Sequence, residues 1–163
     1  IKANNILELY LEKIINLNQP KIDILPIEPK DIDKYWPLAE FMVREAIRFS
    51  GNFSTAEDIK DALHHAEMQL FLAFGHDGDR ENKVWAVVVT RITDLDRLRQ
   101  LEGIICTGSR KELWVEKMAD MMEIFAKQAE CDRICMLMRP GWSRVMKQFG
   151  WNMKHVEMVK EIK

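Results

Sequence analysis

A run of strand, turn, helix and strand in the second half of the chain leaves few folds open. An apolar strand (Leu101–Cys106) enters a short turn (Thr107–Ser109), and an amphipathic helix leaves the turn and continues to Lys127. The next strand, Cys131–Met138, is apolar on both faces, as is usual for a strand in the interior of a sheet. A helix that joins two strands must pack on a sheet, so the pattern predicts an α/β protein.

The turn before the long helix is suited to binding an anion. Free backbone N–H groups and the positive end of the helix dipole point to the same place there, which favours phosphate. Ser109–Glu112 also reads as a capping box, in which Ser109 and Glu112 satisfy the helix end themselves. Arg110 and Lys111 add two cations to the first turn, which is unfavourable unless an anion is bound. A bound phosphate and a self-capped helix are therefore both open.

The rest of the chain predicts helices first, then antiparallel strands, with no repeat and no linker. The expected helices cover 4–17, 32–49, 54–67, the long helix up to 127, and a short helix that begins near Pro140 and ends at Gly150. The expected strands cover 21–29, 69–75, 83–93, 99–106, 131–138 and 151–162. We expect residues 1–20 to form a helical extension and 21–163 one domain. The apolar stripe of the first helix docks either on its own domain or on a partner or second copy.

Composition excludes several classes of function. The 163 residues are 47% hydrophobic and 31% charged, with a formal net charge of -2, so no basic field attracts nucleic acid or a membrane surface. No apolar run approaches the roughly 20 residues of a membrane span. Cys106, Cys131 and Cys135 are an odd number of cysteines, which favours reduced thiols and a cytoplasmic protein. No cysteine or histidine spacing matches a zinc site, so we expect no metal.

The order of the elements and the residues between them resemble the GNAT superfamily of acetyl-CoA-dependent N-acetyltransferases. The resemblance covers about Ile22 to Lys163. Its most specific part is a strand (LEGIICTG) that enters a long helix, a strand (CDRICMLMR) that enters a short helix, and the closing Phe149–Trp151. The run RPGWSRVMKQFGW most resembles the GNAT-like proteins that bacteriophages encode. The resemblance implies a mixed, mostly antiparallel twisted sheet with helices on both faces.

The resemblance also implies a site. Acetyl-CoA would lie in a gap between the strands 101–106 and 131–138, with its pyrophosphate at the turn. An amine would attack directly in a ternary complex, with Glu102 as base, alone or through water, and water or Ser143 as acid. The loop 49–53 would wall the acceptor site. The implied cofactor-binding residues are Ile104, Cys106, Thr107, Gly108, Ser109, Arg110, Lys111 and Trp142.

The sequence departs from the family pattern at two places. The family's phosphate turn has Gln or Arg, two residues, Gly, one residue, and Gly or Ala; here only Gly108 matches, with Ile105 and Arg110 at the outer positions. No tyrosine lies on the short late helix, where Met146 stands about at the place of the family's acid.

Two functions therefore stay open. The chain is an N-acetyltransferase acting on a small-molecule or peptide amine, or it is a GNAT-fold binding or structural protein without acetyl-CoA activity. Glu102 equally fits a strand charge paired with Arg99 or Arg91. A closed gap between the strands 101–106 and 131–138, filled by side chains, would contradict the first function.

Overall fold

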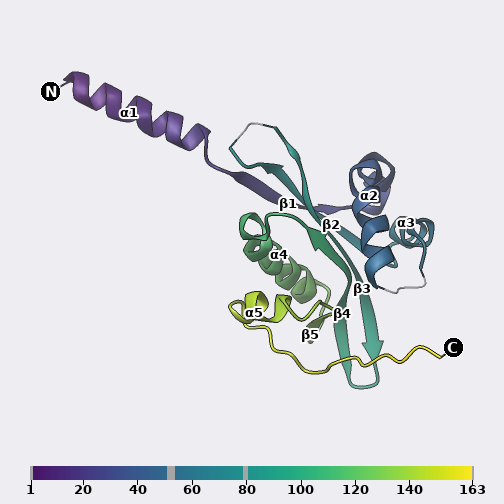
Figure 1. Cartoon of the computed structure of the whole chain (residues 1–163). Coiled ribbons are helices and arrows are strands. Elements are labelled where there is room, and N and C mark those ends of the chain that lie inside the picture. The colour runs from purple at the N-terminus through teal and green to yellow at the C-terminus, as the bar shows by residue number, and fades with distance from the viewer. Residues whose placement is uncertain (1, 51–53, 79–80, 163) are drawn as a thin grey trace.

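The fold is described from a computed structural model, which describes residues 2–50, 54–78 and 81–162. The expected turn at 76–79 and the loop at 49–53 lie partly outside these residues. The helices are α1 (Lys2–Leu17), α2 (Ile32–Ser50), α3 (Ala56–His64), α4 (Val115–Gln128) and α5 (Trp142–Lys147), with the 3-10 turns η1 (Pro29–Asp31) and η2 (Lys111–Leu113) (Figure 1). The strands are β1 (Lys21–Ile27), β2 (Gln69–His76), β3 (Lys83–Leu95), β4 (Leu98–Gly108) and β5 (Arg133–Met136).

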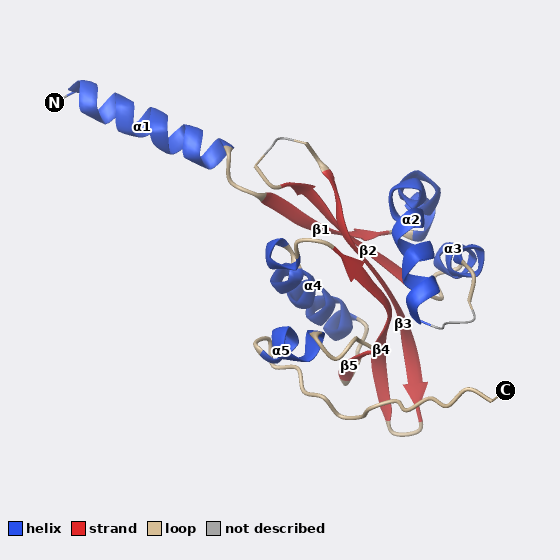
Figure 2. Cartoon of the chain, viewed as in Figure 1, coloured by secondary structure: helices blue, strands red, loops and turns tan. Residues whose placement is uncertain are grey.

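The five strands form one twisted sheet in the order β1-β2-β3-β4-β5 (Figure 2). All neighbouring pairs are antiparallel except β4 and β5, which are parallel and are connected through α4. The predicted mixed, mostly antiparallel sheet with helices on both faces is therefore confirmed. The prediction that 131–138 lies in the sheet interior is wrong: β5 has four residues and is the last strand of the sheet. Ile134, Met136 and Met138 pack on the α4 and α5 side, whereas the apolar Leu137 between them is 71% exposed.

Each face of the sheet has its own hydrophobic core. Helices α2 and α3 cover one face, and α4 and α5 cover the other (Figure 1). Alternation along β3 explains the division, since Ala86 and Val88 face α4 whereas Val87 and Val89 face α2 and α3. Trp85 and Trp114 belong to the core of the α4 and α5 face and are 4% and 1% exposed.

Among the described residues, one expected strand is not found, the first helix does not dock on its domain, and one expected helix is shorter than predicted. Residues 151–162 form no strand; past Trp151 they are exposed, because their alternation is loose and interrupted by charge and no neighbouring strand pairs with them. The first helix does not dock on its own domain, since the described side chains of α1 are exposed. The helix expected over 54–67 runs from Ala56 to His64, with a capping box between Thr55 and Asp58.

Candidate active site

Strands β4 and β5 separate half-way along β4. Their parallel pairing runs from Gln100 with Arg133 to Gly103 with Met136, whereas β4 itself continues to Gly108. The separation begins at a β-bulge, because Thr90 pairs with Gly103 and Val89 with Ile105, which leaves Ile104 without an opposite residue. A bulge bends its strand and increases the local twist. The second half of β4 therefore turns away from β5.

This separation leaves backbone hydrogen-bonding groups at an open edge. The Ser109 N–H donates to the Trp85 carbonyl oxygen at 2.9 Å, so alternate residues 107 and 105 also turn their N–H and C=O groups toward β3. Cys106 and Gly108 consequently turn theirs toward the side on which β5 would lie. Within the described residues, β4–β5 pairing does not extend to either of them. An extended ligand with amide groups could pair with this edge as a strand does.

The turn after β4 is fixed on the core. A Cβ at Gly108 would come within 2.5 Å of the Trp85 carbonyl oxygen and 2.8 Å of the Ala86 Cα, so only glycine fits this close approach. On the other side, the Trp114 indole N–H donates to the Ser109 carbonyl oxygen at 2.8 Å. The turn is therefore held between β3 and the start of α4, in a single place relative to the open edge.

The predicted capping box between Ser109 and Glu112 is wrong. Arg110 has left-handed backbone angles (φ 50°, ψ 51°) and starts η2 without a side-chain cap, and Glu112 pairs with the Arg110 guanidinium instead. That pairing is the main reason why the pKa of Glu112 is lowered and that of Arg110 raised. Arg110 also reaches Asp77 of the β2–β3 turn at 3.4 Å. The Arg110 charge is thus balanced by two carboxylates rather than free for a phosphate.

The start of α4 keeps unpaired N–H groups. The Leu113 and Trp114 N–H groups are satisfied by η2, and α4 begins at Val115 with no side-chain cap on its N-terminus. The first helical N–H groups after Trp114 have no intrahelical acceptor until Met118, which donates to the Trp114 carbonyl oxygen. Helix ends of this kind attract anions. Lys111 lies nearby, with its Nζ 5.7 Å from the centre of the Trp142 ring.

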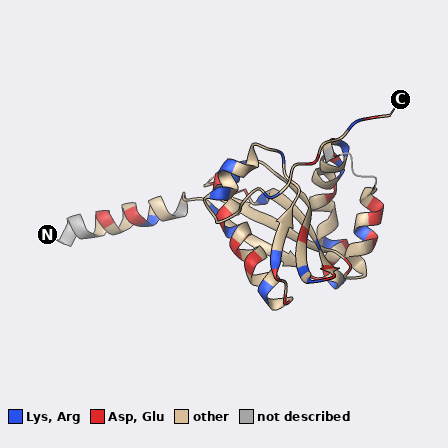
Figure 3. Cartoon of the chain, turned by 90° about the horizontal axis from the view of Figure 1, so that it is seen from below, with Lys and Arg blue, Asp and Glu red and all other residues tan. Residues whose placement is uncertain are grey.

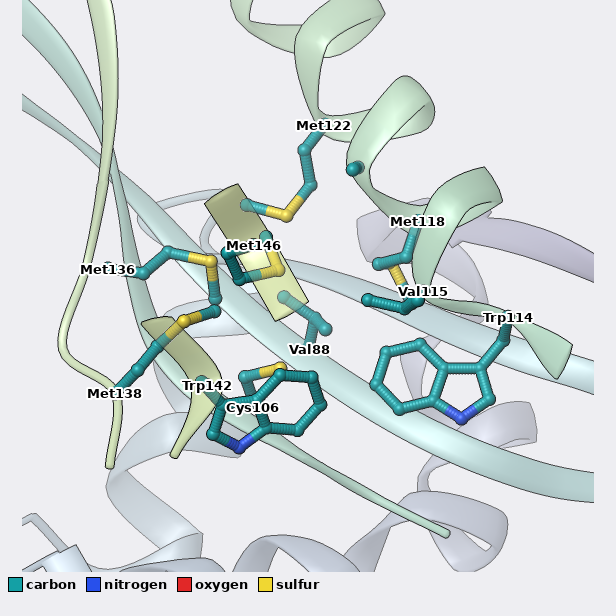
Figure 4. Close-up of a pocket in the computed structure, with 11 residues that line it drawn as sticks. Val88, Cys106, Trp114, Val115, Met118, Met122, Met136, Met138, Trp142 and Met146 are labelled. Carbon is teal, nitrogen blue, oxygen red and sulfur yellow. The ribbon is translucent and has the colours of Figure 1, made fainter. Parts of the chain in front are cut away.

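Side chains fill the gap between the separated strands. They leave a cavity of about 10 Å³, which is close to the space that one water molecule needs. Figure 4 shows sulfur atoms and two indole rings converging on this cavity, and the Trp114 and Trp142 ring centres are 6.0 Å apart. Met136 occupies the space over Gly103, where an added Cβ would meet its Cε at 2.6 Å. The cavity is lined by Val88, Cys106, Trp114, Val115, Met118, Ala119, Met122, Met136, Met138, Trp142 and Met146.

Cys106 contributes a thiol to the cavity but not a nucleophile. Burial raises the pKa of the Cys106 thiol to about 12, so the group is protonated at neutral pH. A protonated thiol is a poor nucleophile and behaves as a small apolar group. Its backbone N–H at the open edge is therefore the part of Cys106 with a potential role in ligand binding.

Glu102, the predicted base, lies on the other face of the sheet. The carboxylate accepts hydrogen bonds from the Arg91 Nε at 2.9 Å and the Thr93 hydroxyl at 3.1 Å, and its side chain is 18% exposed. The bulge at Ile104 reverses the alternation, so that Cys106 faces α4 although it is four residues from Glu102. The structure confirms the ion pair with Arg91 that the sequence left open and does not bring Glu102 into the cavity.

The residues predicted on the late helix fall in different places. Trp142, at the start of α5, lines the cavity. Ser143 is exposed, and its hydroxyl donates to the Pro140 carbonyl oxygen at 2.8 Å. Met146, which stands about where the related pattern has tyrosine, is 5% exposed and closes the inner end of the cavity.

The site residues predicted on β4 and in the turn after it do not all lie at the cavity. Cys106 and Trp142 line the cavity, and Lys111 lies beside Trp142, whereas Ile104 packs against the α2 and α3 face. Thr107–Arg110 belong to the turn and do not line the cavity. Sequence reasoning missed Met136 and Met138 as cavity residues, although their period-2 spacing with Ile134 predicts all three on one face of the expected strand 131–138. It also missed Arg139, whose guanidinium lies 5.3 Å from the centre of the Phe49 ring and connects α2 with the segment after β5. Phe49, near the end of α2, is 71% exposed.

Comparison with known structures identifies the architecture. A predicted acetyltransferase from Clostridium acetobutylicum, crystallised with acetyl-CoA, superposes with a TM-score of 0.61 at 14% identity, over 86% of this chain and 96% of the other. The ribosomal-protein-alanine N-acetyltransferase of Brucella melitensis biovar Abortus 2308 gives 0.60 at 12% identity over 88% and 100%, and the glucosamine-6-phosphate N-acetyltransferase of Arabidopsis thaliana gives 0.59 at 13% over 88% and 99%.

The chain has the GNAT fold. The neighbours are GNAT-family acetyltransferases, and the likeness extends over nearly the whole length of each. At these identities it shows the fold alone. No family model and no curated protein matches the sequence. Among the described residues, no helix combines the length and the apolar character that crossing a membrane requires.

Proposed function

We propose that this chain binds an acyl-CoA thioester along the open edge of β4 and transfers the acyl group to an amine. The separation of β4 from β5 beyond Gly103 carries the proposal. It presents the N–H groups of Cys106 and Gly108 beside the unpaired N–H groups at the start of α4. An amide-rich arm and a phosphate need these two kinds of donor side by side.

The backbone fits such a ligand, and the side chains fit it only after they move. The cavity of about 10 Å³ is far too small for a pantetheine arm. The side chains that fill it include Met136 and Met138, which are only partly buried and are unbranched with three rotatable bonds. We infer that these side chains move aside when the ligand binds, whereas the strand separation and the glycine turn are present beforehand.

Different residues of this chain would bind the ligand and transfer protons. The N–H groups at the open edge and in the turn Thr107–Lys111 hold and orient the ligand, with Lys111 near the phosphates and Trp142 against the arm. When bound, the thioester supplies an activated carbonyl carbon: the amine nitrogen bonds to it, the carbon–sulfur bond breaks, and the thiolate takes up a proton. Glu102 lies on the face of the sheet opposite the cavity, so it would accept the proton of an amine that approaches from that face, through a bridging water. Water or the exposed Ser143 would protonate the thiolate.

The filled cavity favours a second candidate. A chain that keeps the GNAT fold with methionine and tryptophan in place of the ligand would be a binding or structural protein. Met146 in place of a tyrosine and the neutralised Arg110 agree with this alternative. The two candidates make opposite predictions about acyl-CoA.

Isothermal titration calorimetry with acetyl-CoA separates them. We expect saturable binding, weakened about tenfold or more in Lys111→Glu, which reverses a charge beside the cavity residue Trp142. Lys127→Glu is the matched control, since Lys127 lies in the last turn of α4, far along the helix from Lys111, and pairs with Glu123. Binding should raise the free energy of unfolding by about 2.7 kcal/mol at a ligand concentration of about 100 Kd.

The acyl-transfer step needs its own measurement. Thiol release from acetyl-CoA is followed with a panel of small amines and peptides, and Glu102→Gln should slow it without weakening acetyl-CoA binding. Absence of heat and of any shift in the unfolding temperature, from a folded protein, would contradict acyl-CoA binding and support the structural alternative. Binding without thiol release for any amine would contradict the transfer step only.

A further inference from the structure

Helix α1 extends away from the domain with its apolar side chains in solvent (Figure 1). Each large apolar side chain of its described part is between 39% and 68% exposed. These side chains are Ile6, Leu7, Leu9, Tyr10, Leu11, Ile14 and Ile15. An isolated helix of this length is only marginally stable in water. Its apolar surface therefore calls for a partner that the structure does not include.

The apolar side chains form a wide stripe. At 100° per residue, Ile6, Tyr10 and Ile14 lie on the same side as Leu7 and Leu11, and Ile15 extends the stripe. Glu12 points away from it, and Glu8 lies at its edge beside Ile15. The stripe covers about half of the circumference, which is wider than the seam between two helices and typical of a helix within a bundle.

The linker after α1 holds the helix away from its own domain. Residues 18–20 are the only ones between α1 and β1. The Asn18 carbonyl oxygen lies against the β2–β3 turn, where a Cβ added at Gly78 would come within 2.3 Å of it. Pro20 further stiffens the connection. With so short and so closely packed a linker, α1 cannot fold back to bury its stripe on the sheet.

Charge argues against a lipid surface as the partner. The charged residues of α1 are Lys2, Glu8, Glu12 and Lys13, so their charges cancel and the helix is not basic. Helices that lie on anionic membranes carry Lys and Arg on their polar face. Figure 3 shows acidic and basic residues intermixed over the domain, with no single-sign surface beside α1.

We propose that copies of this chain associate through α1, with the stripe of one helix packed on the stripe of another. A second copy supplies a surface of the same length and the same apolar character, and a symmetric contact satisfies both stripes at once. The Glu12 carboxylate stays outside the contact, and the Glu8 carboxylate lies at its rim, where it stays in contact with solvent. The occupant of the stripe is therefore a second copy of this chain.

The area of the stripe sets the expected strength. Complete burial of a large apolar side chain removes roughly 60–120 Å² from water, so the six side chains of the stripe offer roughly 360–720 Å² per copy. This is less than the ~800 Å² per partner of a standard interface. Pairing of two helices alone should therefore be weak and concentration-dependent, and a four-helix bundle, which buries both sides of each stripe, should be tighter.

Sedimentation velocity of the whole chain over about a hundredfold range of concentration tests the proposal. We expect dimers or tetramers that dissociate on dilution, with a parallel loss of helical circular dichroism. The double variant Leu7→Gln/Ile14→Gln should be monomeric throughout, with the thermal unfolding of the domain unchanged. Glu12→Gln is the matched control away from the stripe and should associate like the wild type.

Three results would overturn the proposal. The wild type could be monomeric at every concentration, or the stripe variant could associate as strongly as the control. A monomeric chain that cosediments with phosphatidylserine vesicles through α1 would assign the stripe to a membrane surface instead. The test uses no acyl-CoA, so its outcome is independent of the proposed function.

Discussion

The two faces of the sheet are packed with different kinds of side chain. On the α2 and α3 face, the buried core consists of aliphatic side chains, alanines and Trp36. On the α4 and α5 face it includes Met118, Met122 and Met146, with Met136 and Met138 partly buried beside them. β-Branched and leucine side chains have few rotamers and pack in one way, whereas methionine adapts to irregular space. The adaptable side chains lie where β4 and β5 separate, which is the place where a ligand would need them to move.

Shortening one core side chain on each face should give the largest difference in the free energy of unfolding. Leu72→Ala removes a completely buried side chain from the aliphatic face and should lower the free energy of unfolding by about 2–5 kcal/mol. Met138→Ala should cost about 1 kcal/mol or less, because its side chain is only partly buried and neighbouring methionines can fill the space. Urea unfolding of both variants measures the difference. Equal losses would mean that the two faces are packed alike.

The glycine turn should tolerate no side chain. Gly108→Val forces a Cβ against the β3 backbone and should cost about 1–3 kcal/mol through overpacking. Gly141→Ala is the control, since a Cβ there meets nothing within 4 Å and the residue has helical angles. Its effect should stay within about 0.5 kcal/mol in the same assay. A neutral Gly108→Val would show that the turn is not held against β3.

The buried thiol predicts a loss of stability in alkali. The folded pKa of Cys106 is raised to about 12 from 9.0, so above pH 9 the unfolded chain releases this proton and the folded chain keeps it. Unfolding then becomes easier as pH rises, by up to about 1.4 kcal/mol per pH unit from this group. Cys106→Ala should remove that part of the slope between pH 9 and 11. A wild-type slope that persists unchanged in the variant would show that the thiol is not buried.

Removal of the cap of α3, which covers the α2 and α3 face of the sheet, should change the free energy of unfolding least. The Thr55 hydroxyl accepts from the Asp58 N–H, and the Asp58 carboxylate accepts from the Thr55 N–H, which is the main reason why the pKa of Asp58 is lowered. Thr55→Ala should cost about 1 kcal/mol.

The Asp58 carboxylate adds a dependence on acid. Because its folded pKa lies below the unfolded value of 3.8, its contribution is present above pH 4 and is lost as the pH falls through the folded pKa. Asp58→Asn should flatten the acid side of the stability profile, as measured by thermal unfolding at several pH values. An unchanged profile would exclude Asp58 as a contributor.

Local patterns predicted most of the elements. The alternation of β3, the helical period of α2 and α4, and the glycine after α5 each depend on neighbours in the chain, and the structure confirms them. The errors lie where the outcome depends on distant partners. Ser109 and Glu112 match a capping box, but Asp77, more than thirty residues earlier, helps Arg110 to hold Glu112 in another pairing. Residues 151–162 alternate, but without a strand to pair with they remain extended and exposed.

The same division applies to the candidate site. The sequence identified Gly108, the turn and Trp142, because a glycine between a strand and a helix is a local signal. It could not show the bulge at Ile104, which places Glu102 and Cys106 on opposite faces, since a one-residue shift against β3 leaves no trace in the pattern of either strand. The methionine-filled cavity depends in turn on β5 and α5 folding back against α4, which only long-range packing determines.

By itself the sequence determined the GNAT order of strands and helices and the place of the turn, because periodicity and turn residues are local properties. The tertiary structure decided whether the turn is open for a ligand. Strand register, the glycine contact with β3 and the methionines between the separated strands are set by residues far apart in the chain. The turn that looked like a phosphate site is present and rigid, and the gap beside it holds the side chains that a ligand must displace.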